Sequence, residues 1–278
     1  MSRRAAPKAN DAVRSTQSSS PRRRAAPKAN DAVRLDRWPY PRWIAHRGAG
    51  KLAPENTLAA FRLGASHGYR MFECDVKLSR DGIPFLMHDA DLRRTTDGSG
   101  IGGQYDWQML AQRDAGSWHS RQYAGEALPC LDNIARYCLR NSHHLNIEIK
   151  PTPGTERHTG EVVAGLAAHL WARAPTPPLL TSFAAEALEG ARARAAHLPR
   201  GLLLDQTRTD WLELAQALGC VAIVCNYALW NPTTVAAARA AGMRSLSYTV
   251  NDEATADALL ALGIDGIITD RVDLFAPV

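Results

Sequence analysis

Short apolar runs alternate with amphipathic helical patterns from residue 43 to residue 270, and this alternation restricts the possible folds most. Strands that alternate with helices predict a parallel sheet, because each helix returns the chain to the start of the next strand. The predicted strands are 43–48, 71–78, 83–88, 145–150, 179–183, 201–205, 221–226, 245–250 and 266–270. The predicted helices are 57–67, 161–173, 184–196, 211–218, 232–241 and 253–262.

The length of the patterned region selects a closed barrel within the α/β class. Residues 38–278 make a body of 241 residues, close to the roughly 250 residues of a typical (β/α)8 TIM barrel. An open dinucleotide-binding sheet is the alternative, but the first turn, 46–50, lacks the third glycine at the spacing required there. Residues of about 91–129, after the second strand region, break the rhythm. We interpret them as an insertion that forms a lid or part of the substrate pocket.

The basic charge of the chain is confined to residues 1–37. This tail holds ten Lys and Arg against three Asp, whereas the body holds 23 Lys and Arg against 25 Asp and Glu. The tail also repeats itself, since Arg3 to Arg14 and Arg23 to Arg34 have the same twelve letters. We predict a disordered tail, with a basic arm for anionic partners as the alternative. The slightly acidic body argues against nucleic acid as a partner.

Composition also bears on location. No apolar run approaches the roughly 18 residues of a membrane-spanning helix, so we expect no stable membrane insertion. Met1 to Ser20 show no apolar core of a secretory signal, and a cytoplasmic location is expected. The five cysteines are odd in number and form no Cys-x-x-Cys pair, so we expect reduced packing residues. The oligomeric state is not predicted by any of these features.

Carboxylates recur on one face of two predicted strands. Side chains alternate along a strand, so Glu73 and Asp75 point the same way, while their neighbours form an apolar face. Glu148 and Lys150 repeat this arrangement two strands later. Carboxylates held close together repel each other unless a cation or a shared proton is present. A hard divalent metal bound by Glu73, Asp75 and Glu148 is the simplest resolution, and Lys150 would then face a substrate phosphate.

Two histidines end predicted strands beside these carboxylates. His46 is followed by Arg47, and His88 follows the strand at 83–88. Such histidines can supply a general base and a general acid near neutral pH. Arg47 offers a fork of donors that suits phosphate oxygens. The other seven histidines are predicted to lie at the surface.

The order of these motifs resembles that of the glycerophosphodiester phosphodiesterases. The matching segments are HRG at 46–48, PENT at 54–57, ECD at 73–75, HD at 88–89, NIEIK at 146–150, SF at 182–183, YTVN at 248–251 and DGIITD at 265–270. The resemblance implies that Glu73, Asp75 and Glu148 bind one Mg²⁺ or Ca²⁺ and that His46 and His88 form the acid–base pair. It further implies substrate or phosphate contacts from Arg47, Glu55, Lys150, Phe183 and Tyr248.

The family usually has a tryptophan where this chain has Tyr248, a departure that bears on substrate fit rather than on catalysis. The predicted reaction is hydrolysis of a small glycerophosphodiester to glycerol 3-phosphate and an alcohol. Attack by water and attack by a neighbouring glycerol hydroxyl both stay open. Two alternatives also stay open: a phospholipase C-like or D-like enzyme that acts on intact lipid, and a ligand-binding barrel without catalysis.

Overall fold

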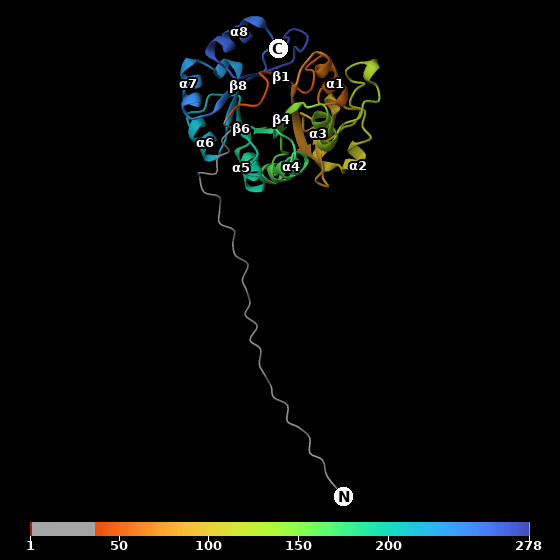
Figure 1. Cartoon of the computed structure of the whole chain (residues 1–278). Coiled ribbons are helices and arrows are strands. Elements are labelled where there is room, and N and C mark those ends of the chain that lie inside the picture. Colours follow the sequence, from red (N-terminus) through yellow and green to blue (C-terminus); the bar gives the residue numbers. More distant parts are fainter. Residues whose placement is uncertain (2–36, 278) are drawn as a thin grey trace.

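Eight parallel strands close into a barrel in the structure, a computed structural model that describes Met1 and residues 37–277 (Figure 1). The strands are β1 (Trp43–Ala45), β2 (Met71–Leu78), β4 (His144–Ile149), β5 (Leu179–Ser182), β6 (Arg200–Leu204), β7 (Ala222–Asn226), β8 (Arg244–Tyr248) and β9 (Gly266–Thr269). β1 pairs with both β2 and β9, which closes the sheet. The predicted (β/α)8 barrel is therefore confirmed.

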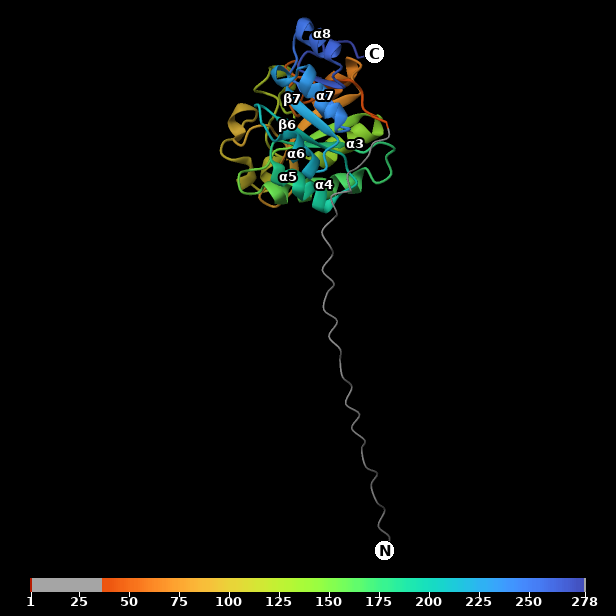
Figure 2. The ribbon, with the colours of Figure 1, turned by 90° about the vertical axis from the view of Figure 1, so that its left-hand side faces the viewer.

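Helices surround the strands, as Figure 1 shows. In Figure 2, α4 to α8 follow one another along one side of the barrel. The helices are α1 (Leu58–Ser66), α3 (Leu131–Arg140), α4 (Glu156–Leu170), α5 (Ala185–Arg194), α6 (Trp211–Ala217), α7 (Pro232–Ala240) and α8 (Glu253–Leu262). α3 was not among the predicted helices, and α4 begins five residues before its predicted start. The other boundaries lie within three residues of prediction.

One predicted strand has a different role from the rest. Residues 83–88 contain β3 (Pro84–Leu86), which pairs antiparallel with the end of β2 and lies outside the barrel. Because β3 runs back along β2, Val76 pairs with Leu86, and the Met87 amide donates to the Asp75 carbonyl at 3.1 Å. This hairpin therefore returns His88 to the level of the β2 carboxylates.

The barrel interior is apolar at the amino ends of its strands and polar at the carboxyl ends. Buried residues that fill the lower interior include Ile44, Met71, Leu179, Val224, Leu246 and Ile268. Glu73 and Asp75 follow Met71 at alternate positions of β2, so they stand on the same interior face. The outward residues of the strands pack against the helices in two larger clusters. The polar interior side chains therefore gather at one mouth of the barrel, at the carboxyl ends of the strands.

Residues 91–129 form a compact layer over β3. They contain η1 (Leu92–Arg94), η2 (Gly102–Gln104), α2 (Trp107–Leu110) and η3 (Arg121–Tyr123). Their small apolar core comprises Phe85, Met87, Leu92, Leu110, Ala115 and Leu128. Glu126 ties this layer to the barrel, because its carboxylate accepts from the Ala59 amide in the first turn of α1 at 3.0 Å. We refer to residues 91–129 as the insertion.

Three expectations from composition concern the whole chain. The predicted disordered tail lies outside the described residues, except for Met1 and Arg37. Within the described part of the chain, none of the helices has the length and apolar character needed to cross a membrane. All five cysteines are free thiols, and four of them are buried, as expected for packing residues.

Candidate active site

A cavity of about 150 Å³ opens at the carboxyl ends of the strands and collects most of the predicted site residues. Its lining includes His46, Arg47, Glu73, His88, Glu148, Lys150, Phe183 and Tyr248. The other two predicted residues lie directly behind this lining. Asp75 is buried beside Lys150, and Glu55 contacts Arg47. The structure therefore brings all ten predicted residues together.

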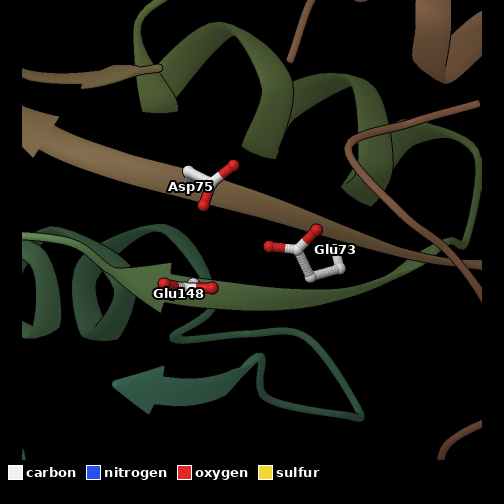
Figure 3. Close-up of side chains that lie close together, drawn as sticks. All are labelled: Glu73, Asp75 and Glu148. Carbon is white, nitrogen blue, oxygen red and sulfur yellow. The ribbon is translucent and has the colours of Figure 1, made fainter. Parts of the chain in front are cut away.

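The three predicted metal ligands form one cluster, shown in Figure 3. Asp75 on β2 pairs in register with Glu148 on β4, and Glu73 stands one interior position earlier. One carboxylate oxygen of each residue lies within 4.8 Å of those of the other two, and all three side chains are almost fully buried. Glu73 Oε1 is buried and has no hydrogen-bond partner among the residues that the structure describes. Three carboxylates, one of which has an oxygen without a hydrogen bond, fit a small divalent cation.

The pKa shifts in this cluster indicate that it lacks positive charge. Burial and the neighbouring Asp75 raise the pKa of Glu73 to about 8. Burial and the same neighbour also raise the pKa of Glu148. Burial alone would raise the pKa of Asp75 as well, but Arg47 and Lys150 lower it well below its usual range. A bound cation would allow all three carboxylates to be ionised together.

Two cations border the carboxylates. Lys150 Nζ lies 2.9 Å from Glu148 Oε1 and 3.4 Å from Asp75 Oδ1. Arg47 Nη1 lies 2.8 Å from Glu55 Oε1, and its Nε lies 3.2 Å from Asp75 Oδ2. Asn56, to which no role had been assigned, donates to Asp75 Oδ2 at 2.8 Å and accepts from the Asp75 amide at 3.1 Å. Asn56 thus fixes the orientation of the central carboxylate.

His46 is held by an aspartate from the opposite end of the sequence. Its Nδ1 lies 2.6 Å from Asp270 Oδ1, and its Nε2 lies 3.8 Å from Glu73 Oε2. Asn251 fixes Asp270 in turn, through a side-chain bond of 2.9 Å. Burial would lower the pKa of His46, but the hydrogen bond to Asp270 and the charge of Glu73 raise it. Asp270 and Asn251 belong to the matching segments, but neither had been assigned a role.

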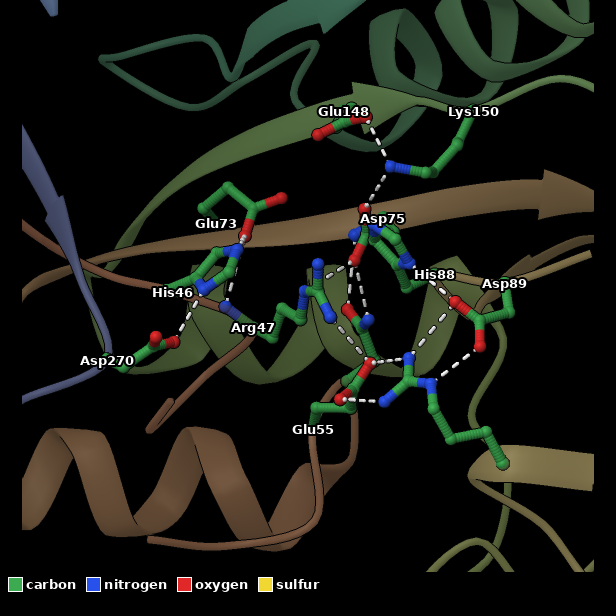
Figure 4. A network of polar contacts seen from close by, with 12 residues as sticks. His46, Arg47, Glu55, Glu73, Asp75, His88, Asp89, Glu148, Lys150 and Asp270 are labelled. Carbon is green, nitrogen blue, oxygen red and sulfur yellow. Dashed lines mark hydrogen bonds and ion pairs between the residues drawn. The ribbon is translucent and has the colours of Figure 1, made fainter. Parts of the chain in front are cut away.

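His88 has an equivalent partner next to it in sequence. His88 Nδ1 lies 2.7 Å from Asp89 Oδ1, and burial lowers the pKa of the imidazole. Since an ionised carboxylate only accepts, Nδ1 of each histidine is the donor, and Nε2 of each is left to exchange a proton. Figure 4 shows the two histidines on either side of the acidic cluster.

Two aromatic rings form the rim of the cavity. Phe183 is 42% exposed and meets the Tyr248 ring edge to face, with centroids 6.0 Å apart. The Tyr248 hydroxyl donates to the Leu204 carbonyl at 2.9 Å, and this hydrogen bond fixes the orientation of the ring. The rings give this side of the cavity an apolar wall next to the ammonium group of Lys150.

His143 was predicted to lie at the surface but is buried, and His144, predicted likewise, is half-buried in β4. His143 is only 6% exposed and packs edge-on against the Phe72 ring, with centroids 5.2 Å apart. It follows α3, whose presence had not been predicted, and this helix explains its burial. His143 lies at the amino end of β4, away from the cavity.

A glycine allows His46 and Asp270 to approach each other. Gly50 has a φ of +59°, and a Cβ added there would lie 2.2 Å from the Asp270 Cα. Gly50→Ala is therefore expected to lower the free energy of unfolding by about 3 kcal/mol or more, because overpacking adds to the left-handed strain.

Gly82→Ala is the matched control, since Gly82 has a φ of +79° and open space around its Cβ position. It should cost about 1–2 kcal/mol from backbone strain alone. Urea denaturation of both variants measures the difference. Equal losses in the free energy of unfolding would show that the close approach of Gly50 to Asp270 does not contribute to the effect.

Comparison with known proteins supports the class that the fold suggests, a (β/α)8-barrel enzyme with its active site at the carboxyl ends of the strands. Residues 46–274 match the glycerophosphoryl diester phosphodiesterase family, and the chain belongs to this family. The family and the enzyme class predicted from the sequence are thereby confirmed.

Individual relatives span nearly the same length. YhdW of Bacillus subtilis, whose name places it among these phosphodiesterases, is 31% identical over 242 residues, which is 83% of this chain and 94% of that protein. An Oleispira antarctica phosphodiesterase, solved in complex with the product sn-glycerol-3-phosphate, is 34% identical with a TM-score of 0.78. That comparison covers 83% of this chain and 93% of the other. A glycerophosphodiester phosphodiesterase of Agrobacterium tumefaciens is 29% identical with a TM-score of 0.73, over 86% of this chain and 100% of the other.

Proposed function

We propose that this protein hydrolyses small glycerophosphodiesters to glycerol 3-phosphate and an alcohol, with one divalent cation, Mg²⁺ or Ca²⁺, as its cofactor. The observation that carries the proposal is the position of two aspartate-held histidines beside a cluster of three buried carboxylates. The product bound in the Oleispira antarctica relative supports glycerol 3-phosphate as the product here. A cytoplasmic location remains part of the proposal.

The phosphate would be bound from two sides. Glu73, Asp75 and Glu148 would hold the cation, which when bound would neutralise the phosphate as a Lewis acid. Lys150 and Arg47 contact the same carboxylates and would add two fixed positive charges. Such charges stabilise the transition state because they are already oriented when negative charge develops on the phosphate oxygens.

The two histidines would move the protons. One Nε2 would take a proton from the nucleophile, either water or the neighbouring glycerol hydroxyl, and the other would give a proton to the leaving alcohol. Asp270 and Asp89 would keep both rings oriented with Nδ1 protonated. Phe183 and Tyr248 would bound the space for the organic part of the substrate.

The proposal is tested by the release of glycerol 3-phosphate. Glycerophosphocholine and glycerophosphoethanolamine should both be cleaved when Mg²⁺ or Ca²⁺ is present. Phosphatidylcholine vesicles serve as the comparison substrate and should neither bind the protein nor be cleaved. Faster cleavage of the vesicles would favour an enzyme of intact lipid, and no cleavage of any diester would favour a binding barrel.

A further inference from the structure

Arg94, a residue of the insertion, bridges two carboxylates that Figure 4 labels, Asp89 and Glu55. Its Nε and Nη2 lie 2.6 and 3.1 Å from the two oxygens of Asp89. Its Nη1 and Nη2 lie 2.7 and 2.8 Å from the two oxygens of Glu55. A single guanidinium therefore contacts all four oxygens of two carboxylates that are 34 residues apart in sequence.

Each of these carboxylates also contacts a proposed functional side chain. Asp89 Oδ1 binds His88 Nδ1 at 2.7 Å, and Glu55 Oε1 binds Arg47 Nη1 at 2.8 Å. The contacts therefore run without a break from His88 to Arg47, with Arg94 at the centre. Arg94 itself does not line the cavity. Its hydrogen-bonded contacts reach the cavity lining through His88 and Arg47.

The charges show why a cation is needed at this point. Without Arg94, Glu55 would keep Arg47 alone as an ion-pair partner within the described part of the chain, and would hold it more strongly, away from a phosphate. Asp89 would lose its hydrogen bonds from Arg94. These bonds are the largest cause of its lowered pKa, and they fix its orientation toward His88. The planar fork of arginine can satisfy two carboxylates at once, whereas the compact ammonium of lysine cannot reach both in this way.

The insertion holds Arg94 in place. Arg94 ends η1, whose first residue, Leu92, is 1% exposed in the insertion core. The Asp91 side chain accepts from the Arg93 amide at 2.9 Å, and the Thr96 hydroxyl donates to the Leu92 carbonyl at 2.7 Å. The turn that carries Arg94 is thus fixed on both sides, so the guanidinium is presented to the site by a rigid support.

We propose that Arg94 is a positioning residue that couples the proton-transferring His88 to the phosphate-binding Arg47 by holding Asp89 and Glu55 together. The proposal rests on the function proposed above. Its contact with Asp89 acts on kcat through His88. Its contact with Glu55 acts on KM through Arg47. The insertion would thereby support the site from outside the cavity.

A double-mutant cycle tests this coupling. Arg94→Met should lower kcat/KM for glycerophosphocholine by about 10- to 100-fold, a typical loss when a residue that orients a functional side chain is removed. In a His88→Ala background the same change should lower kcat by less than about threefold, because the residue through which it acts is gone. Arg94→Lys should recover only part of the loss, since it keeps the charge without the fork.

Arg80→Met is the matched control. Arg80 binds Asp106 of the insertion through two bonds of 2.8 and 2.6 Å but contacts neither Asp89 nor Glu55. It should leave kcat/KM within about twofold of wild type. Both arginines are at least 45% exposed, so all variants should fold, which circular dichroism would verify.

A second readout does not depend on turnover. Histidine-selective ¹⁵N NMR, with the His88 signal assigned from its loss in His88→Ala, should show a changed Nδ1 resonance in Arg94→Met and an unchanged one in Arg80→Met. Equal losses of kcat from Arg94→Met in the wild-type and His88→Ala backgrounds, or an unmoved Nδ1 resonance, would overturn the positioning role. Absence of diester cleavage by wild type would instead overturn the proposed function, and the NMR result would still decide the contact.

Discussion

His46→Ala and His88→Ala are each expected to lower kcat by about 10²–10⁴-fold, or roughly 3–5 kcal/mol of transition-state stabilisation. The expectation follows from the hydrogen bonds of both Nδ1 atoms to aspartates, which leave the two Nε2 atoms to exchange protons. The double variant should lose much less than the product of the two single losses, because acid and base act as one unit. His169→Ala, an exposed change on α4, is the matched control and should retain the wild-type rate.

A change of leaving group should assign the two roles. A nitrophenyl diester has a leaving group that departs without a proton, so it should largely restore the rate of the variant that lacks the general acid. The variant that lacks the base should stay slow with both substrates. If neither variant is rescued and both keep more than about a tenth of the wild-type rate, the paired-histidine mechanism is wrong.

Removal of divalent cations with EDTA should abolish turnover, and Mg²⁺, Ca²⁺ or Mn²⁺ should restore it. Three carboxylates with ligand oxygens within 4.8 Å of one another need a cation to be ionised together. Glu148→Gln should raise the metal concentration for half-maximal activity by about tenfold or more, a typical cost of altering a metal site. Full activity after exhaustive chelation would contradict the metal assignment.

The stability of the same variant separates metal binding from folding. Burial and Asp75 raise the pKa of Glu148, so in EDTA the loss of its charge should leave the Tm unchanged or higher. Added Mg²⁺ should raise the Tm of wild type, because a ligand of the folded state stabilises it, and should raise that of Glu148→Gln much less. Glu186→Gln, an exposed change on α5, should respond to metal as wild type does.

Much of the site could be predicted because it follows strand periodicity. Glu73 and Asp75 occupy alternate positions of β2, Glu148 pairs in register with Asp75 from β4, and Lys150 directly follows β4, so strand alternation predicts a shared interior face. Asp270 obeys the same rule, as a carboxylate directly after the last strand, and could have been predicted from it. α3 was also predictable, since Leu131, Ile134, Ala135 and Cys138 have helical spacing.

Other contacts carry no local signal. Asn56 reaches Asp75 from a turn in which its φ is +60°, and sequence periodicity does not extend to such turns. Arg94 lies in an insertion of short turns, where which arginine meets which carboxylate depends on tertiary packing. The antiparallel course of β3 likewise depends on the hairpin at Gly82 rather than on the apolar pattern of the strand.

The central claim concerns which ester bond is broken, and ³¹P NMR of glycerophosphocholine hydrolysis tests it most directly. With Mg²⁺ or Ca²⁺ present, the diester signal should be replaced by that of glycerol 3-phosphate, either directly or through a transient cyclic phosphate, while free choline accumulates. Conversion to phosphocholine and glycerol, or a diester signal that persists with metal present, would contradict the account.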